Sequence, residues 1–333
     1  MVKYIGMDAH SSSCTFSVSD AKGCEIDNVT METNGKLIKS YLRSIEGCKK
    51  LTFEECELSR WLFGIISPEV DELIICNPVA NRDYKKAKTD KLDARKPAKL
   101  LRGGFLSPVF HDGSDRERFR SLMSSYQDIV DEGIRIKNRY KSLFRKNGQR
   151  IKGTKLYNDD NLLEGLSRNE DRFIGGHMYG LLAKLEQSRQ AYIKEIGLYS
   201  KKFKELKYLK TIPGIGDIRA AKIVSQVVNP HRFATKYKYY SYCGLVRHKR
   251  ISAERNYGTA KIWGNRVLKC VYKMAGHDAL KGNNRLLDLY NALRKRGVSD
   301  DNAYNAVCRK IAAISLSIWK HSKRYDEQMI RAI

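Results

Sequence analysis

The sequence predicts an α/β domain followed by an all-α region, and three observations support this fold class. Short apolar segments alternate with helical periodicity over residues 1–112, whereas apolar residues recur at helical spacing over residues 113–206. The last third, residues 207–333, opens on a proline–glycine turn and has no proline after Pro230. We therefore expect a mixed-sheet domain, a long helical spacer resembling a coiled coil, and a mostly helical domain with a helix-hairpin-helix element.

The first of these parts is predicted to contain strands and helices in the order βββαβαβ. The three leading strands have hairpin-like spacing, and the later strands are separated by helices. Such an order predicts a mixed sheet in which antiparallel strands come first and βα crossovers follow. The expected strands are residues 3–8, 14–19, 25–32, 51–53 and 72–76, and the expected helices are 35–45 and 58–66.

The middle part is predicted to form two long antiparallel helices. Apolar residues recur between charged ones over residues 115–147, and again over 177–206. Residues 148–176 are rich in Gly, Asn and Asp and are expected to form a loop. A helical pair of this length serves as a spacer or as an assembly surface.

Charge is distributed unevenly along the 333 residues, which carry 63 Lys and Arg against 37 Asp and Glu, a net charge of +26. Residues 1–112 contribute +1, residues 113–206 contribute +7 and residues 207–333 contribute +18. A strongly basic region indicates a polyanionic partner. No apolar run approaches the roughly 20 residues of a membrane span, and no signal peptide is evident, so we expect a cytoplasmic, nucleic-acid-binding protein without a membrane partner. The eight cysteines form no CxxC pair, which disfavours a zinc site.

Four acidic residues are candidates for a metal site. Asp8 and Glu54 each end a predicted strand, and Asp90 and Asp93 are three residues apart in KTDKLDA, on one face of a predicted helix. Clustered carboxylates repel one another unless cations neutralise them, and such a cluster typically holds two Mg²⁺ ions in phosphodiester chemistry. Glu55 is the alternative to Glu54, which we prefer because it directly follows the apolar run.

Two segments of the basic third are candidates for nucleic-acid contacts. Ile212-Pro-Gly-Ile-Gly216 resembles the hairpin of a helix-hairpin-helix element, in which Gly214 and Gly216 allow backbone N–H groups to approach a phosphate. The second segment, residues 242–266, mixes cations, aromatic residues and glycines around Ser252, a hydroxyl able to attack a phosphodiester. The further candidate contacts are Tyr242, Arg247, Arg250, Arg255, Lys261, Asn265 and Arg266.

Together these motifs resemble the insertion-sequence transposases of the IS one-ten family, the bridge-RNA-guided recombinases. YIGMDAH, FEECELSRWLF, IICNP and KTDKLDARKPAKLLRGG look like that family's DEDD domain, which has a RuvC-like RNase H fold. LKTIPGIG, YYSYCGLV and WGNRVLK look like its C-terminal transposase domain. The resemblance covers nearly the whole chain and is weakest at residues 115–205.

The resemblance implies a mechanism and a set of partners. Asp8, Glu54, Asp90 and Asp93 match the family's metal-binding acids, and Ser252 matches its catalytic serine, which is thought to link covalently to DNA. The family acts as a dimer or tetramer whose composite site joins the acids of one subunit to the serine of another. A structured noncoding guide RNA pairs with target and donor DNA. The sequence departs from the family pattern at Arg247, where the family has Pro, at Ala253, where it has Gly, at Ile262, where it has Lys, and at Pro97.

Two alternatives remain open at this point. A metal-dependent junction-resolving endonuclease would use the acids and water without a covalent serine step. A non-catalytic RNA- or DNA-binding protein would need neither the acids nor a metal. A 3′–5′ exonuclease is disfavoured, because Asp8 is followed by Ala9 and His10 rather than by the D-x-E pattern of those enzymes.

Overall fold

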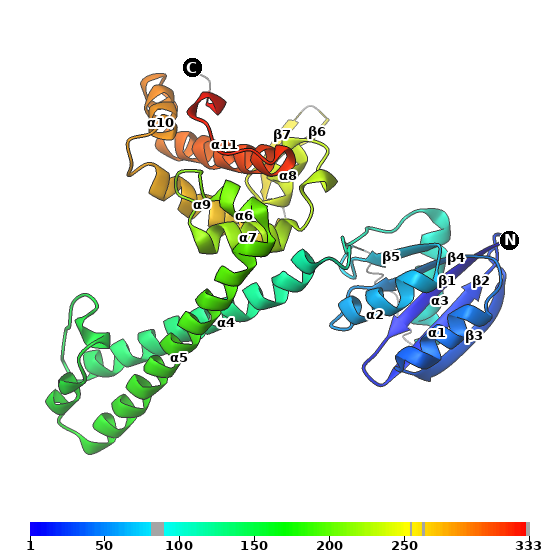
Figure 1. The fold of residues 1–333 in the computed structure, drawn as a ribbon, viewed down its shortest axis with the longest axis horizontal. Coiled ribbons are helices and arrows are strands. Elements are labelled where there is room, and N and C mark those ends of the chain that lie inside the picture. Colours follow the sequence, from blue (N-terminus) through cyan, green and yellow to red (C-terminus); the bar gives the residue numbers. More distant parts are fainter. Residues whose placement is uncertain (81–89, 254, 262–263, 331–333) are drawn as a thin grey trace. The chain divides into compact units, whose positions relative to one another are not determined.

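The computed structural model describes residues 1–80, 90–253, 255–261 and 264–330, and within these ranges the side chains of residues 90–93, 160, 248–250, 256, 260 and 261 are not described. The chain divides into two compact units, Met1–Ser114 and Asp115–Ile333, which we call unit 1 and unit 2 (Figure 1). No helix in the described ranges is long and apolar enough to cross a membrane.

Unit 1 is built on a five-stranded mixed sheet with strand order β3-β2-β1-β4-β5. β1 pairs antiparallel with β2 and parallel with β4, and Gly6 of β1 lies beside Thr52 of β4. The element order is the predicted βββαβαβ, followed by a third helix. The bounds are β1 Val2–Ala9, β2 Ser13–Ser19, β3 Glu25–Glu32, α1 Gly35–Ser44, β4 Cys48–Glu54, α2 Ser59–Ile66, β5 Glu72–Cys76 and α3 Asp90–Gly103.

One face of the sheet is apolar and is covered by α1 and α2. Alternate residues of β1 and β4 point to this face and are fully buried, because side chains along a strand alternate between its two faces. They pack against the inward stripes of the two helices (Figure 1). The shared core comprises Ile5, Met7, Cys14, Phe16, Val18, Leu51, Phe53 and Ile75 from strands and Ile38, Leu42, Leu62 and Ile66 from helices.

The opposite face carries small residues and lies against α3. A Cβ atom added to Gly6 would meet the Ala94 carbonyl oxygen at 2.0 Å and the Ala98 nitrogen at 2.7 Å, so the helix backbone lies directly on β1. Arg102 donates to the Ala21 carbonyl in the β2–β3 turn, which adjoins the N-terminal half of β1. The C-terminal end of α3 therefore lies toward that turn, and its N-terminal end points toward the C-terminal ends of β1 and β4.

Unit 2 begins with a pair of long helices, α4 (Asp115–Lys146) and α5 (Asn169–Lys202). They pack along each other and are joined by a connection containing short 3-10 turns, Lys155–Tyr157 and Asp160–Gly165. Their far ends share a separate small core, which comprises Ile136, Tyr140, Leu143, Phe144, Leu156, Leu166 and Leu182. Their near ends contribute Phe119, Met123, Tyr126 and Ile196 to the main core of unit 2. The helical pair is thus packed into the same unit as the C-terminal helices.

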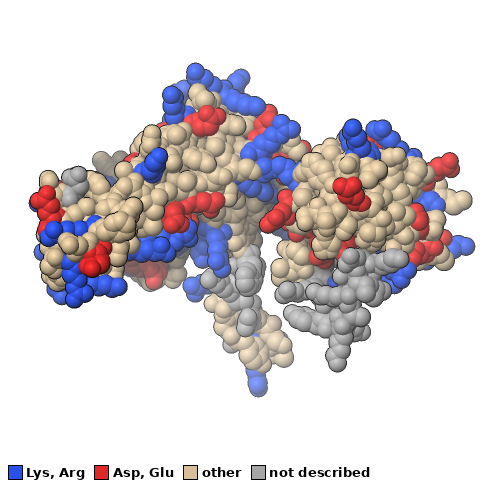
Figure 2. All heavy atoms as spheres, turned by 90° about the horizontal axis from the view of Figure 1, so that it is seen from below, with Lys and Arg blue, Asp and Glu red and all other residues tan. Residues whose placement is uncertain are grey.

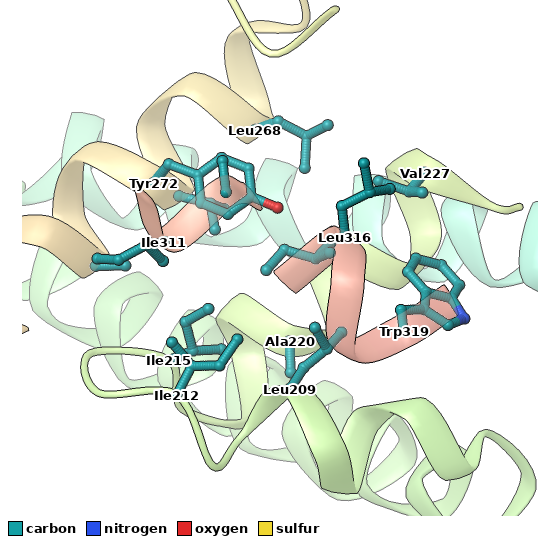
Figure 3. Packing of buried hydrophobic residues seen from close by; sticks show 14 of the residues in the cluster. Leu209, Ile212, Ile215, Ala220, Val227, Leu268, Tyr272, Ile311, Leu316 and Trp319 are labelled. Atoms are coloured by element: carbon teal, nitrogen blue, oxygen red, sulfur yellow. The ribbon is translucent and has the colours of Figure 1, made fainter. Parts of the chain in front are cut away.

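The remainder of unit 2 is a helical assembly with one two-stranded hairpin. Figure 3 shows Ile212 and Ile215, from the turn between α6 and α7, around the same core as Leu316 of α11. The glycine between them, Gly214, has φ +81°, and an added Cβ would lie 2.2 Å from the Ala275 carbonyl oxygen of α9. The elements are α6 Lys204–Leu209, α7 Asp217–Val227, α8 Lys236–Tyr242, β6 Arg247–Ser252, β7 Arg255–Lys261, α9 Arg266–Ala279, α10 Arg285–Lys295 and α11 Asp300–His321.

The structure confirms the predicted fold class and adds two details. The helix expected over residues 177–206 begins earlier, at Asn169, where Glu170 and Asp171 in the first turn interact favourably with the helix dipole. The β6–β7 hairpin was not expected in the mostly helical last third. The predicted division into residues 1–112, 113–206 and 207–333 stays a prediction.

Candidate functional site

Asp8 and Glu54 lie side by side at the C-terminal edge of the sheet. β1 and β4 are parallel and pair as far as Met7 beside Phe53, so the next residue of each strand is also a neighbour. Neighbouring strands are about 4.8 Å apart. Asp8 is two residues after Gly6, and Glu54 is two residues after Thr52, so both carboxylates project to the face that α3 covers.

The N-terminal end of α3 reaches this same edge and carries the other two acids. Asp90 is the first residue of the helix, and Asp93 directly precedes Ala94, whose carbonyl rests over Gly6. Their side chains lie outside the described set, so the backbone alone places them. α3 is continuous through Pro97, whose missing N–H leaves the Asp93 carbonyl without its usual helical partner.

The immediate surroundings distinguish Glu54 from Glu55. The Glu55 carboxylate lies 2.7 Å from His111 Nε2, and that imidazole stacks on Phe63 at 5.8 Å between ring centroids. Glu54 is exposed at the edge of the sheet. These positions favour Glu54 as the residue that faces Asp8.

His10 is a neighbour of Asp8 that the sequence analysis did not single out. Its Nε2 lies 3.2 Å from Asp8 Oδ2, and the imidazole is more than half exposed. The D-x-H spacing was the available signal, because His10 directly follows the last residue of β1 and so stays close to Asp8. His10 is thus a further polar group at this edge.

The donor set at this edge suits a hard divalent cation. Carboxylate oxygens are the ligands that Mg²⁺ prefers, and Asp8 and Glu54 lie at neighbouring strand ends, at the edge that the backbone of the N-terminal end of α3 reaches. Among the side chains that the structure describes, no three His, Cys, Asp or Glu residues cluster closely enough to hold a metal. Asp90 and Asp93 are outside that set, so the cluster as proposed needs their carboxylates.

Ser252 lies at the tip of the β6–β7 hairpin and is exposed. It is the last residue of β6 and pairs with Arg255, the first residue of β7. Ala253 follows it with φ +45°, a left-handed conformation that costs a non-glycine residue about 1–2 kcal/mol. The tip therefore presents a hydroxyl beside a cation at a strained turn.

Four of the predicted nucleic-acid contacts have structural roles. Gly214 packs on α9 as described above, and Gly216 is the N-cap residue of α7. The Tyr242 hydroxyl donates to the Gln226 carbonyl at 3.0 Å, and the Arg232 guanidinium lies over its ring. Asn265 caps α9 by accepting from Leu268 N at 3.0 Å, and its amide donates to Gln226 Oε1 at 2.8 Å.

The predicted cationic contacts are distributed over two regions of unit 2. Arg247 and Arg255 are exposed at opposite ends of the hairpin, and Arg266 is exposed at the start of α9. The side chains of Arg250 and Lys261 are outside the described set. Arg266 and Gly216 both line a cavity of about 960 Å³ between α4, α5, α7 and α9, whereas Arg247 lines a different one. The structure therefore does not gather these residues into one cluster.

Lys and Arg side chains lie at the surface in several separate groups on the face that Figure 2 shows. Their excess is concentrated in unit 2, because residues 115–333 carry a net charge of +25, whereas residues 1–112 carry +1. Such an excess attracts nucleic acid without specifying a sequence.

Comparison with known families identifies two regions of the chain. A family model described as "Transposase", for the DEDD domain of IS110 elements, matches residues 5–147. A second model, described as "Transposase IS116/IS110/IS902 family", matches residues 206–291. No curated protein matches the chain. The first match contains all four candidate acids, and the second contains the Gly214 turn and Ser252.

Proposed function

Because the chain belongs to the IS116/IS110/IS902 family of transposases, and so acts on DNA as a transposase or recombinase, we propose that it exchanges DNA strands through metal-binding acids and a serine nucleophile under RNA guidance. A DEDD domain of this kind indicates dependence on a divalent metal. The observation that carries the proposal is the convergence of Asp8, Glu54 and the N-terminal end of α3 at one edge of the sheet.

The proposed metal site consists of Asp8, Glu54, Asp90 and Asp93, and its proposed occupant is a pair of Mg²⁺ ions. Such ions, when bound, would polarise the scissile phosphate and neutralise charge that develops on its oxygens. The four carboxylates would hold the ions, and His10, whose Nε2 lies 3.2 Å from Asp8 Oδ2, would orient the Asp8 carboxylate. Glu55 has no direct part, since its carboxylate contacts His111.

Ser252 is the proposed nucleophile. Its Oγ attacks the phosphorus, the P–O bond to one deoxyribose breaks, and the departing oxygen takes up a proton while the serine releases its own. A hydroxyl of the second DNA strand then attacks the seryl phosphodiester, and Ser252 regains its proton. One phosphoester bond forms for each one broken, so no external energy source is required. Arg255, opposite Ser252 in the hairpin, stabilises the negative charge of the phosphate.

A trapping experiment tests the serine step. We expect the wild-type protein, incubated with donor DNA, target DNA, guide RNA and Mg²⁺, to give a covalent protein–DNA adduct on a denaturing gel and a recombined product. Ser252→Ala should abolish both, whereas Ser167→Ala, which changes another exposed serine of unit 2, should abolish neither. Persistent recombination by Ser252→Ala would remove the covalent step. Persistent cleavage without rejoining would favour the junction-resolving endonuclease.

The acids and Ser252 belong to different units, and we propose that they meet between two chains of a dimer or tetramer. Mixing tests this arrangement, because we expect an Asp8→Asn chain and a Ser252→Ala chain each to be inactive alone. Mixed together, they should recover a fraction of the wild-type recombination if the site is composite. No recovery from a mixture shown to exchange subunits would place both parts in one chain.

We propose RNA guidance without assigning it to particular residues. The strong positive charge of unit 2 is compatible with RNA binding. Recombination should require the structured RNA transcribed from the DNA beside the gene, and altering its pairing segments should redirect the reaction to the matching DNA. Recombination at an unchanged site without this RNA would contradict guidance while leaving the transposase activity intact.

A further inference from the structure

A basic cavity of about 760 Å³ lies at the base of the β6–β7 hairpin, at the end away from Ser252. It is formed by the segment that leads into β6, one strand residue of β7, the middle of α9 and the first turns of α11. Its lining consists of Gly244, Leu245, Val246, Arg247, Thr259, Lys269, Lys273, Asp301, Asn302, Asn305 and Arg309. These residues come from four elements separated along the chain, so tertiary packing assembles the site.

Among the described residues, the cavity is lined by four cations and one acid. The cations are Arg247, Lys269, Lys273 and Arg309, and the acid is Asp301. Lys273 Nζ donates to the neutral amide oxygen of Asn305 and lies over the Tyr304 ring at 4.6 Å, so it is positioned without being neutralised. Among the residues that the structure describes, none of the four cations forms an ion pair. The cavity therefore has an uncompensated positive charge.

Close backbone contacts hold the lining in place. A Cβ atom added to Gly264 would lie 2.5 Å from the Gly244 nitrogen, so the segment before β6 and the segment before α9 touch through their backbones. Gly244 has φ +62°, and an added Cβ there would lie 3.7 Å from Lys269 Cδ. The Lys269 stem thus runs along the Gly244 backbone. A preorganised cation loses less conformational entropy on binding an anion than a free surface lysine does.

The larger cavity beside α7 differs in this respect. Its Arg219 pairs with Asp278 at 2.7 Å, and its Lys210 pairs with Asp217. These cations already have anionic partners within the protein. Two of the four cations that line the larger cavity are thus neutralised by an ion pair, whereas no ion pair of the described residues involves the four cations at the hairpin base.

We propose that this cavity binds backbone phosphates of the DNA strand on which Ser252 acts. The assignment rests on the proposed function, which places Ser252 at DNA. Arg247 and Ser252 are the first and last residues of β6, so the Arg247 end of the cavity lies about 16 Å along the strand from Ser252 at about 3.3 Å per residue. That distance corresponds to about five base pairs along a duplex. We call this phosphate-binding cavity, lined by Arg247, Lys269, Lys273 and Arg309, the phosphate clamp. The hairpin thus extends from the phosphate clamp at its base to the reacting phosphate at its tip.

Salt-dependent binding tests the clamp independently of chemistry. Affinity for a short DNA duplex is measured without metal at several salt concentrations, for the full-length protein and for Lys269→Gln/Arg309→Gln. Each phosphate contact contributes about 0.9 to the magnitude of the slope of log affinity against log salt concentration. The slope of the double variant should therefore be smaller in magnitude by about 1 to 2. Lys295→Gln/Lys323→Gln removes the same charge from exposed positions outside the cavity and should leave the slope unchanged. Equal slopes for the two double variants would overturn the clamp.

A substitution of opposite sign provides a second test. Asp301→Asn removes the one acid among the described lining residues and should tighten DNA binding by a few fold at low salt, an effect that the Lys269→Gln/Arg309→Gln background should suppress. Weaker binding, or the same gain in both backgrounds, would contradict the assignment.

Single neutral methylphosphonates locate the contacted phosphate on the DNA. They are introduced one at a time into DNA that spans the end of the insertion sequence. Neutralising a phosphate about five base pairs from the exchanged bond should weaken binding of the wild-type protein but not of Lys269→Gln/Arg309→Gln. The same salt titration is run in parallel with a structured RNA probe. If Lys269→Gln/Arg309→Gln lowered the slope for the RNA but not for the duplex, the cavity would be assigned to RNA and the assignment to DNA would be overturned. If the wild-type protein bound no duplex, the proposed function itself would fail. If it bound duplex with equal slopes for both double variants, the clamp alone would fail.

Discussion

Replacing Gly6 by Ala tests whether the contact between β1 and α3 sets the geometry of the acidic edge. The added Cβ would lie 2.0 Å from the Ala94 carbonyl oxygen, whereas Cβ atoms essentially never approach a neighbour within 3.0 Å, so α3 must retreat by about 1 Å, the difference between these distances. Functional sites tolerate displacements of about 0.5 Å, and Mg²⁺ demands oxygen ligands at about 2.0–2.1 Å. The retreat should therefore separate Asp90 and Asp93 from Asp8 and Glu54.

The expected effects of Gly6→Ala are a loss of metal affinity and a moderate loss of stability. Overpacking of this kind costs about 1–3 kcal/mol, which corresponds to roughly 4–12 °C in the melting temperature of a domain the size of unit 1. Mn²⁺ affinity, followed by electron paramagnetic resonance, should fall at least tenfold at a temperature where the variant is folded. Gly64→Ala is the control, because its added Cβ meets nothing within 4 Å in α2 and should change stability by less than about 1 kcal/mol. Wild-type Mn²⁺ affinity in a folded Gly6→Ala protein would refute the reasoning.

Three further predictions concern the two units. Gly214→Ala combines a φ of +81° with a Cβ 2.2 Å from the Ala275 carbonyl oxygen, so urea unfolding should show unit 2 destabilised by about 2–5 kcal/mol, whereas Gly133→Ala, which meets nothing, should not be destabilised. The Arg95 guanidinium, bonded to Glu25, lowers the pKa of that carboxyl from 4.5 to about 2; its stabilising effect is complete above about pH 4.5 and is lost as the pH falls toward 2. Arg95→Gln should therefore destabilise unit 1 at pH 7 but not at pH 2, and an equal loss in melts at both pH values would contradict this linkage. Ala253→Gly relieves the left-handed strain of the hairpin tip and should raise stability by up to about 1 kcal/mol in thermal melts, whereas an unchanged or lower melting temperature would contradict the strain.

The unit 1 fold could be predicted because its signals are local. The short, largely apolar runs of β1 and β4 and the amphipathic stripes of α1 and α2 are each visible in the sequence. The β6–β7 hairpin was missed because neither strand is apolar: RHKRIS and RNYGTAK are rich in cations and polar residues, and pairing rather than burial holds them. Strand prediction from apolar alternation has no signal in such a segment.

In the candidate site, too, positions along the chain could be predicted from the sequence, whereas contacts between distant residues could not. The positions of Asp8 and Glu54 at strand ends could be predicted from the sequence, whereas the contact between Glu55 and His111 is a tertiary one that only the structure shows. Asn265 has a side chain suited to nucleic acid, yet the structure uses it to cap α9. The residues proposed to form the phosphate clamp, among them Arg247 and Arg309, come from separate elements of the chain. No spacing in the sequence indicates that they lie close together.

The central claim is that two strand ends and the start of α3 form one metal site, and a Mn²⁺ titration of single variants tests it most directly. Asp8→Asn, Glu54→Gln, Asp90→Asn and Asp93→Asn should each weaken Mn²⁺ binding by tenfold or more, whereas Glu55→Gln and the exposed Glu57→Gln should bind as the wild-type protein does. Full Mn²⁺ affinity in Asp90→Asn and Asp93→Asn, or a loss in Glu55→Gln equal to that in Glu54→Gln, would contradict the account.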